Sequence, residues 1–294
     1  MSTRVPAWSL AVAAMISVQL GAAYSTHLFD SVGPAGTAWL RLTMGALIFL
    51  GITRPRLRGV GRRDLLVVLA LGVATGLLTT AFLSAVARIP LGTAVAIEFL
   101  GPLGVAVARS HDRRSLVWPA LALVGVVLLT EPWQGEIDAL GVGLAALSAV
   151  CWATYIVLTQ KVGDRFSGLE GLSITIPVAA LTAAFVGVPQ AWGHITWQVL
   201  AASLGLALLL PVLPFSLELV ALRRLTTAAF GTLMALEPAI GVVAGVVILS
   251  QVPRPLQVVG VVLVVAAGVG AERNGHRDDG PDAHEDSPIP LGTA

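Results

Sequence analysis

Long apolar stretches, separated by short polar segments, run through almost the whole chain. Each stretch has about 20 residues, the length that an α-helix needs to cross the hydrocarbon core of a bilayer. The stretches are continuous runs of Leu, Val and Ala, without the apolar and polar alternation that is typical of a transmembrane barrel. This pattern predicts an all-α polytopic membrane protein with ten transmembrane helices. The predicted spans are 7–25, 35–53, 65–87, 91–108, 115–130, 139–160, 169–189, 196–217, 226–249 and 255–271.

Composition supports the membrane class and narrows the alternatives. The 294 residues are 56% hydrophobic and only 12% charged, whereas a soluble domain has about a quarter of its residues charged. Ten spans with short loops leave no room for a sizeable soluble domain. The net charge of +1 gives no electrostatic support for a nucleic-acid partner.

Basic residues are distributed unevenly between the two sides of the predicted bundle. Of the 18 Lys and Arg residues, one set of alternate loops and termini holds all but Arg41, Arg88 and Arg254. Because Lys and Arg concentrate on the cytoplasmic side, both termini are predicted to be cytoplasmic, in the cell (inner or plasma) membrane. The last segment, 272–294, is acidic and rich in proline, so we expect a disordered cytoplasmic tail.

The two halves of the chain resemble each other. Leu83, Ala85, Arg88 and Pro102 recur at a constant offset as Leu219, Ala221, Arg224 and Pro238, and the run that begins at Gly125 recurs at Gly260. Each half has five spans, an odd number, so the second half begins on the opposite side of the membrane. The sequence therefore predicts two inverted five-helix repeats, 7–130 and 139–271, an arrangement typical of secondary transporters.

Charges within the predicted spans are the main candidates for function, because each costs roughly 2.5–3.5 kcal/mol at the bilayer centre on insertion scales. The four candidates are Arg41, Glu98, Glu218 and Glu237.

Glu98 and Glu237 fall near the middle of equivalent predicted spans, and each precedes a proline. Proline leaves a carbonyl one turn earlier without its partner and can open the helix. A carboxylate beside free carbonyls can hold an ammonium group or a proton; the alternative is a structural carboxyl that is hydrogen-bonded to a neighbouring helix. The residues assigned to the helix breaks are Gly101, Pro102, Gly231 and Pro238.

The other two charges have several interpretations. Arg41, about six residues into its predicted span, can bind a substrate carboxylate, extend to the outer interface, or pair with Glu98. Glu218 lies close to Arg223 and Arg224, so a gate or an interfacial ion pair is as reasonable as a substrate role. Tyr24, Trp152 and Tyr155 can line a cavity, but aromatic residues near the ends of spans are also common interfacial anchors.

Searches for catalytic and metal-binding motifs are negative. The chain has no Walker loop, HExxH or G-x-S-x-G motif, and it has no cluster of Cys and His. No metal, cofactor or enzymatic activity is therefore predicted.

Three segments carry a resemblance to a known family: 89–102 (IPLGTAVAIEFLGP), 213–218 (LPFSLE) and 230–238 (FGTLMALEP). With Arg41 in the second span, the chain resembles the EamA branch of the drug/metabolite transporter superfamily, and within it the threonine/homoserine exporter (RhtA-type) family. The resemblance covers roughly residues 7–271. It implies ten helices, inverted repeats, and export of small amino acids or related compounds driven by the proton gradient. The segment 249–252 (LSQV) departs from the Gly-Glu pair that the family often carries there.

The leading hypothesis is a secondary transporter that exports small amino acids by proton antiport with alternating access. Its partners are a small-molecule substrate, protons and the lipid bilayer. One alternative is a multidrug or polyamine exporter, which needs the glutamates but not Arg41. Alternatives from other classes are a membrane enzyme, which lacks the nucleophile or metal set that it needs, and a receptor or scaffold, which has only the short tail for a partner.

Overall fold

We analysed a computed structural model of the chain. It describes residues 6–53, 61–108, 116–131, 133, 138–163, 170–222 and 233–274. Helices and their connections make up these ranges, and no strand occurs within them. The predicted all-α class is confirmed.

The first part of the chain forms the following elements: α1 (Ala7–Ser25), the 3₁₀ turn η1 (Thr26–Leu28), α2 (Phe29–Ile52), α3 (Arg62–Val86), α4 (Leu91–Glu98), α5 (Leu100–Ala108) and α6 (Val117–Thr130). The second part forms α7 (Ala139–Gly163), α8 (Glu170–Ala191), α9 (Trp197–Ala207), the π-helical turn η4 (Leu208–Val212), α10 (Leu213–Leu222), α12 (Glu237–Leu249) and α13 (Pro255–Asn274).

Apolar length and composition identify membrane-spanning helices in this set. Within the described ranges, 6 helical stretches are long and apolar enough to cross a membrane, and the first of them, Trp8–Ile52, contains both α1 and α2. Three shorter apolar helices, Val117–Thr130, Glu237–Leu249 and Pro255–Ala271, accompany them. The chain is therefore a multi-pass membrane protein.

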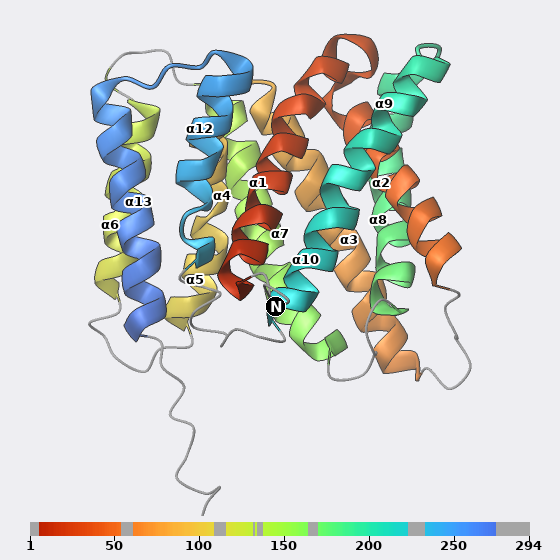
Figure 1. Cartoon of the computed structure of the whole chain (residues 1–294), viewed down its shortest axis with the longest axis horizontal. Helices are drawn as coiled ribbons and strands as arrows, with labels where there is room; N and C mark the ends of the chain where they lie inside the picture. Colours follow the sequence, from red (N-terminus) through yellow and green to blue (C-terminus); the bar gives the residue numbers. More distant parts are fainter. Residues whose placement is uncertain are drawn as a thin grey trace, which may run out of the picture.

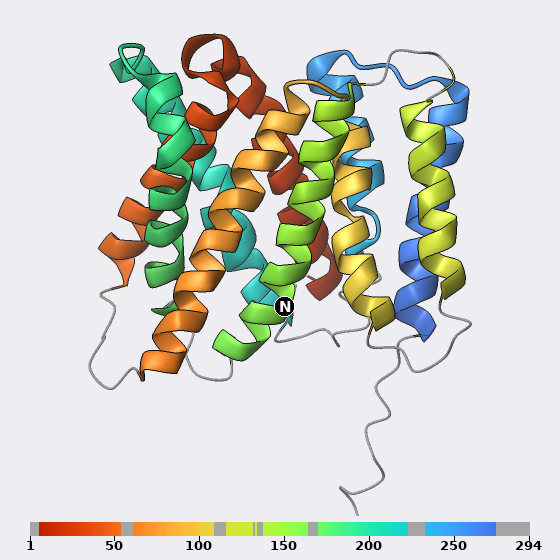
Figure 2. The same ribbon diagram turned by 180° about the vertical axis from the view of Figure 1, so that it is seen from behind.

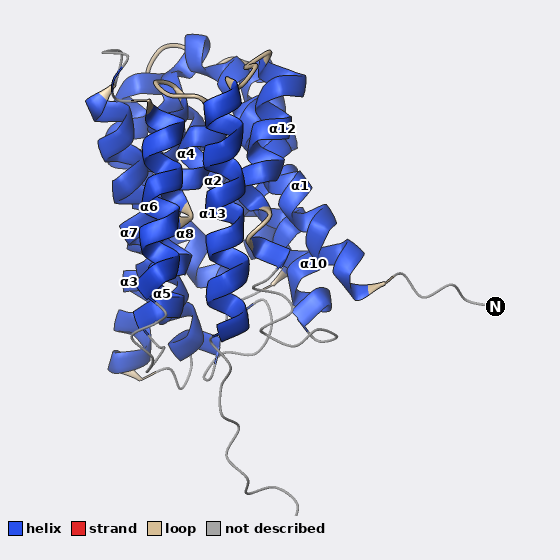
Figure 3. Cartoon of the chain, turned by 90° about the vertical axis from the view of Figure 1, so that its left-hand side faces the viewer, coloured by secondary structure: helices blue, strands red, loops and turns tan. Residues whose placement is uncertain are grey.

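The helices run side by side along one common direction. Figure 1 shows α6 and α13 at one edge of the bundle and α2, α8 and α9 at the other, with α1, α4, α7 and α12 between them. The reverse view places α3, α4, α5 and α7 on the near side (Figure 2). Figure 3 views the bundle from the left-hand side of Figure 1, and α6 and α13 lie nearest the viewer there.

Large apolar side chains point outward from the bundle. Phe185 on α8 is 84% exposed, Val247 on α12 is 75% exposed, and Val150 on α7 is 64% exposed. Such side chains are unfavourable in water and favourable in lipid. The outward-facing apolar surface thus agrees with a membrane environment.

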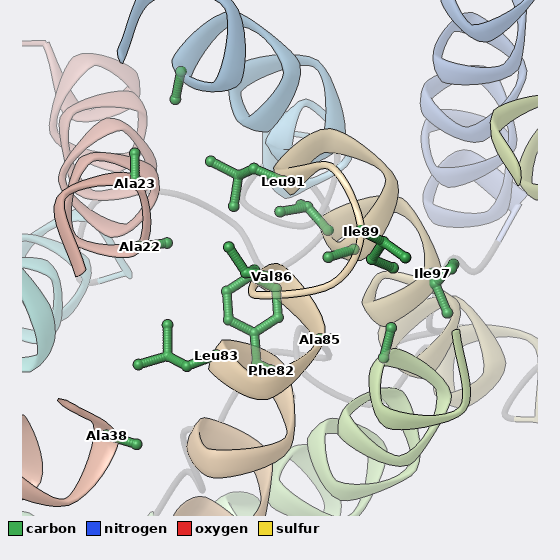
Figure 4. Packing of buried hydrophobic residues seen from close by; sticks show 14 residues of the cluster. Ala22, Ala23, Ala38, Phe82, Leu83, Ala85, Val86, Ile89, Leu91 and Ile97 are labelled. Carbon is green, nitrogen blue, oxygen red and sulfur yellow. The ribbon is translucent and has the colours of Figure 1, made fainter. Parts of the chain in front are cut away.

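The centre of the bundle is packed with small and medium-sized apolar residues. A buried cluster joins α1, α3, α4, α7 and α12, with Phe82 and Leu83 of α3 at its centre (Figure 4). Ala22 and Ala23 of α1 lie against it. Helix association within a membrane depends on close packing of this kind, since lipid tails are as apolar as the side chains.

Several predicted boundaries differ from the structure. The second helix begins at Phe29, six residues before the predicted start, because Gly33 adopts φ 70° and joins two helical segments there. The predicted span 196–217 is divided at η4, where Leu210 has a non-helical backbone and Pro211 follows. Most of the predicted tail and residues 226–232 lie outside the described residues.

Candidate functional site

Both membrane glutamates lie at helix ends, beside the prolines at which the sequence predicted helix breaks. Glu98 is the last residue of α4, and a turn at Phe99 separates it from α5. Pro102 explains this break, because it has no N–H to donate to the Glu98 carbonyl one turn earlier. Glu237 is the first residue of α12 and is followed by Pro238, which suits the first turn of a helix.

Glu98 is buried and has one direct partner. The residue is 8% exposed, and its Oε1 accepts a hydrogen bond from Ser148 Oγ of α7. Ser148 Oγ also lies 3.3 Å from the Leu78 carbonyl of α3, which is an alternative acceptor for the same hydroxyl. Ser148 was not predicted, because a single serine in an apolar helix has no distinguishing sequence pattern.

Gly101 brings α5 close to the helix that carries Ser148. A Cβ at Gly101 would overlap the carbonyl oxygen of Ala149 on α7. Only glycine permits this approach without a backbone shift. The predicted break residue therefore also holds the broken helix against α7. Gly231, the other predicted glycine, lies outside the described residues.

Arg41 is buried in the bundle and faces its interior. The residue is 3% exposed, so its burial favours a place inside the bundle over the alternative that the side chain extends to the outer interface. Its Nη1 donates a hydrogen bond of 3.4 Å to Ser25 Oγ of α1, while its Nε has no partner in the described part of the chain. Arg41 and Glu98 interact electrostatically, but no ion pair joins them among the described residues.

The other two carboxylates complete an interior cluster of charge. Glu237 is 4% exposed and interacts electrostatically with both Glu98 and Glu218. Glu218 lies on α10, and it also interacts electrostatically with Tyr155 of α7. The predicted partners of Glu218, Arg223 and Arg224, lie outside the described residues.

The predicted aromatic residues divide into two groups. Trp152 and Tyr155 lie on α7, one and two turns beyond Ser148, and Tyr155 packs beside Val68 and Leu71 of α3. Tyr24 lies in the last turn of α1, where it is 47% exposed and its ring centroid is 5.9 Å from that of His27. The structure therefore links Tyr155, through Glu218, with the interior charges.

A separate polar region lies at the opposite end of the bundle from the start of α1 and the end of α13 (Figure 1). It surrounds a cavity of about 390 Å³ between the ends of α4, α6, α12 and the connections beside them. Two ion pairs border this cavity, Arg88–Asp138 at 3.0 Å and Arg254–Glu131 at 3.2 Å.

Asp138 has two functions in this polar region. It accepts a hydrogen bond of 2.8 Å from the N–H of Gly141, so it caps the start of α7. That N–H, together with the Arg88 guanidinium, lowers the pKa of the Asp138 carboxyl below its ordinary value.

Metal chemistry has no candidate site in the part of the chain that the structure describes. No group of three or more His, Cys, Asp or Glu side chains is close enough there to hold a metal ion.

Comparisons with known proteins place this arrangement in a class. A solved crystal structure covers 89% of this chain and 97% of its own, with a TM-score of 0.55 and 20% identity, so the two share a fold. The model of the EamA-like transporter family matches residues 139–270. The bundle with its interior charges is thus a membrane transporter.

Curated relatives define the family more closely. The chain is 35% identical over 280 residues to the threonine/homoserine exporter RhtA of Escherichia coli (strain K12). The aligned residues make up 91% of this chain and 92% of the relative. It is also 35% identical over 283 residues to the RhtA of Salmonella typhimurium (strain LT2), covering 92% and 94%. The chain belongs to the EamA-like transporter family, together with these RhtA exporters.

Proposed function

We propose that this chain exports small amino acids in exchange for protons, with threonine and homoserine as the first substrates to test. The relatives are named for these two substrates. The observation that carries the proposal is the relation between Arg41 and Glu98. Both are more than nine-tenths buried and they interact electrostatically, yet no ion pair joins them among the described residues.

A zwitterion satisfies both of these groups. The Arg41 guanidinium presents several N–H donors in a planar fork that matches a carboxylate. Glu98 and Glu237 present acceptors for an ammonium group. Trp152 and Tyr155, on the same helix as Ser148, are positioned to border the bound molecule.

Proton exchange follows from the cost of an isolated carboxylate. When the ammonium group leaves, an ionised carboxylate without a partner is expensive in apolar surroundings. Binding a proton removes that cost, so Glu98 and Glu237 carry either the substrate ammonium or a proton across the membrane. The release of one is thereby coupled to the uptake of the other.

Ten crossings are the topology that we infer for this mechanism. The described elements support it when α4 with α5, and α9 with α10, each count as one broken span. Both α1 at its start and α13 at its end lie at the same end of the bundle (Figure 1), as an even number of crossings requires. With the excess of Lys and Arg at that end, we assign it to the cytoplasm, in the cell membrane.

Packing between the two predicted repeats, 7–130 and 139–271, supports an inverted pseudo-twofold relation. The equivalent helices α2 and α8 pack on each other, as do α6 and α13. Gly125 of α6 and its sequence equivalent Gly260 of α13 are in mutual contact, since a Cβ on each would lie 2.7 and 2.6 Å from the carbonyl oxygen of the other. A residue meets its own equivalent only at a twofold axis.

Transport into inverted membrane vesicles tests the proposed function. Labelled threonine or homoserine should accumulate when a proton gradient is imposed, and an uncoupler should abolish the accumulation. Glu98→Gln should lose gradient-driven uptake, while Glu131→Gln, which changes a carboxylate in the polar region beside the cavity, should retain it. Wild-type uptake no greater than that of vesicles without the protein would exclude the amino-acid assignment.

A cationic drug or polyamine is the second candidate substrate. The observation in its favour is the interior charge balance, because Glu237 interacts electrostatically with both Glu98 and Glu218, whereas Arg41 is the one buried arginine among the described residues. A cation needs no arginine. Arg41→Ala should therefore leave polyamine transport intact, whereas it should abolish the transport of a zwitterion.

A further inference from the structure

Gln19 of α1 is a buried amide with an unused acceptor. The residue is 3% exposed, and its Oε1 has no hydrogen-bond donor among the described residues. Its polar neighbours on the same helix differ: Ser17 donates to the Leu209 carbonyl at 2.7 Å, and Ser25 donates to the Gly21 carbonyl at 2.6 Å. An acceptor that is removed from water without a partner destabilises the fold, so its retention suggests a ligand.

The position of this amide links it to the two membrane glutamates. A Cβ built on Gly241 of α12 would lie 3.4 Å from Gln19 Oε1 and 3.0 Å from a methyl group of Val95 on α4. Gly241 is one turn after Glu237 on the same face of α12, and Val95 is about one turn before Glu98. Gln19 thus lies where α1, α4 and α12 meet, one helical turn from each glutamate.

Other buried atoms without a partner are less informative. Thr159, Thr175 and Ser203 have hydroxyl groups, which can rotate toward a carbonyl of the preceding turn of their own helix. A glutamine amide has no such local acceptor or donor within easy reach. Its unused oxygen therefore indicates an external donor more strongly than an unused hydroxyl does.

Donors and acceptors on a hydroxy amino acid can be matched to the interior groups one by one. The carboxylate suits Arg41, and the ammonium group suits Glu98 and Glu237. The side-chain hydroxyl is the one polar group left over, and it is a donor. Gln19 Oε1 is an unmatched acceptor in the same part of the bundle.

We propose that Gln19 determines specificity by accepting a hydrogen bond from the side-chain hydroxyl of the exported amino acid. This inference rests on the proposed function. A site that is built to bond a hydroxyl discriminates against the analogue that lacks it, because the buried acceptor is then left unpaired. 2-Aminobutyrate is that analogue for both threonine and homoserine, since it has their four-carbon skeleton without the hydroxyl.

The test compares uptake of labelled threonine and 2-aminobutyrate into inverted vesicles, for wild type and Gln19→Leu. Wild type should prefer threonine by about five- to tenfold, a factor that one hydrogen bond supplies. Gln19→Leu should lower threonine uptake by about that factor and leave 2-aminobutyrate uptake within about twofold, so that the preference disappears. Ser17→Ala, on the same helix, is the matched control and should keep the wild-type ratio.

A second variant guards against loss of folding in Gln19→Leu. Gln19→Asn keeps the amide but withdraws it by one methylene, and the hydroxyl of homoserine is one carbon farther along the side chain than that of threonine. This variant should shift the threonine-to-homoserine ratio toward homoserine by about threefold.

The outcomes distinguish a failure of the proposed role of Gln19 from a failure of the proposed export function. Equal losses for threonine and 2-aminobutyrate in Gln19→Leu, or an unchanged threonine-to-homoserine ratio in Gln19→Asn, would overturn the role of Gln19 while the exporter assignment stands. Wild-type vesicles that take up neither amino acid would overturn both.

Discussion

Charged groups are paired differently beside the cavity at one end of the bundle and in the interior of the bundle. Beside the cavity, Arg88 pairs with Asp138 at 3.0 Å and Arg254 pairs with Glu131 at 3.2 Å. In the interior, Arg41 has one long hydrogen bond to a serine and no carboxylate partner among the described residues, although Glu98 is within electrostatic range.

This difference is the opposite of what the energies of exposed and buried charges would favour. An exposed ion pair contributes only about 0–1 kcal/mol, because water solvates its members well when they are apart. An unpaired charge in an apolar interior costs several kcal/mol. The chain therefore pairs Arg88 with Asp138, where pairing contributes little, and leaves Arg41 without a carboxylate partner among the described residues, where pairing would contribute most. The unpaired interior charges make sense when a substrate or a proton completes them.

The largest effect that we expect is a separation of function from stability at Arg41. Arg41→Met should lower threonine uptake by about 100-fold, since it removes the carboxylate ligand. The apparent melting temperature of the purified variant should stay the same or rise, because a buried unpaired charge is replaced by an apolar side chain of similar length. Retained uptake, or a lower melting temperature, would contradict a ligand role for this arginine.

A smaller effect is expected when Glu98 loses its partner. Ser148→Ala removes the hydroxyl that donates to Glu98 Oε1, so the carboxyl is held less firmly. Threonine uptake should fall by about three- to tenfold, as one hydrogen bond to a charged group suggests, and the loss should be recovered in Ser148→Thr. Ser203→Ala on α9 changes a buried hydroxyl that has no hydrogen-bond partner among the described residues, and it should leave uptake near the wild-type rate.

The ion pairs beside the cavity should show the opposite behaviour, with stability affected and transport retained. Arg254→Ala leaves the Glu131 carboxylate, which is 7% exposed, without that cation. We expect the free energy of unfolding to fall by about 1–3 kcal/mol, and Glu131→Gln to cost less because no buried charge then remains. Thermal melts of both variants, with uptake assays beside them, measure this. A variant that loses transport but not stability would contradict the purely structural role that we expect for these ion pairs.

The smallest effect concerns pH at the more exposed pair. The N–H of Gly141 and the guanidinium of Arg88 lower the pKa of Asp138 in the folded protein. The ionised carboxylate is thus favoured by folding, and its contribution is fully present above the unfolded-state pKa of about 3.9. The contribution is lost as the pH falls below that value toward the folded pKa.

Melting temperatures measured from pH 7 to pH 3 check this direction. Asp138→Asn should show a slightly weaker dependence on pH than wild type in the acidic part of the range, and the two curves should run parallel above about pH 5. An advantage of wild type over Asp138→Asn in melting temperature that shrinks as the pH rises from 3 to 5 would have the wrong sign. Uptake at neutral pH should be unaffected by this variant.

Parts of the site could be predicted from the sequence, and the reason is energetic. Glu98, Glu237 and Arg41 stand out because a charge within an apolar run is expensive and therefore rare. Ser148 and Gln19 do not stand out, because serine and glutamine are common in helices. Their significance lies in contacts with distant residues, such as the bond from Ser148 to a carboxylate 50 residues earlier in the chain.

Helix ends were the least predictable feature of the fold. Proline at positions 102 and 238 indicated breaks, but not that Glu98 would end one helix and Glu237 begin another. The start of α2 was predicted six residues too late, because hydropathy alone does not detect the short helical segment that begins at Phe29 and precedes the interruption at Gly33, where φ is 70°.

Hydropathy along the chain was enough to establish a helical membrane bundle, because hydrocarbon leaves the backbone no hydrogen-bond partners outside its own helix. The same cost made the few charges within the spans visible as candidates. Which of those charges meet and which remain without a partner was decided only by the tertiary structure. That outcome depends on how each helix is rotated about its axis and on the helix breaks at Gly33 and Phe99. The rotations and the breaks are both set by packing between segments far apart in the chain.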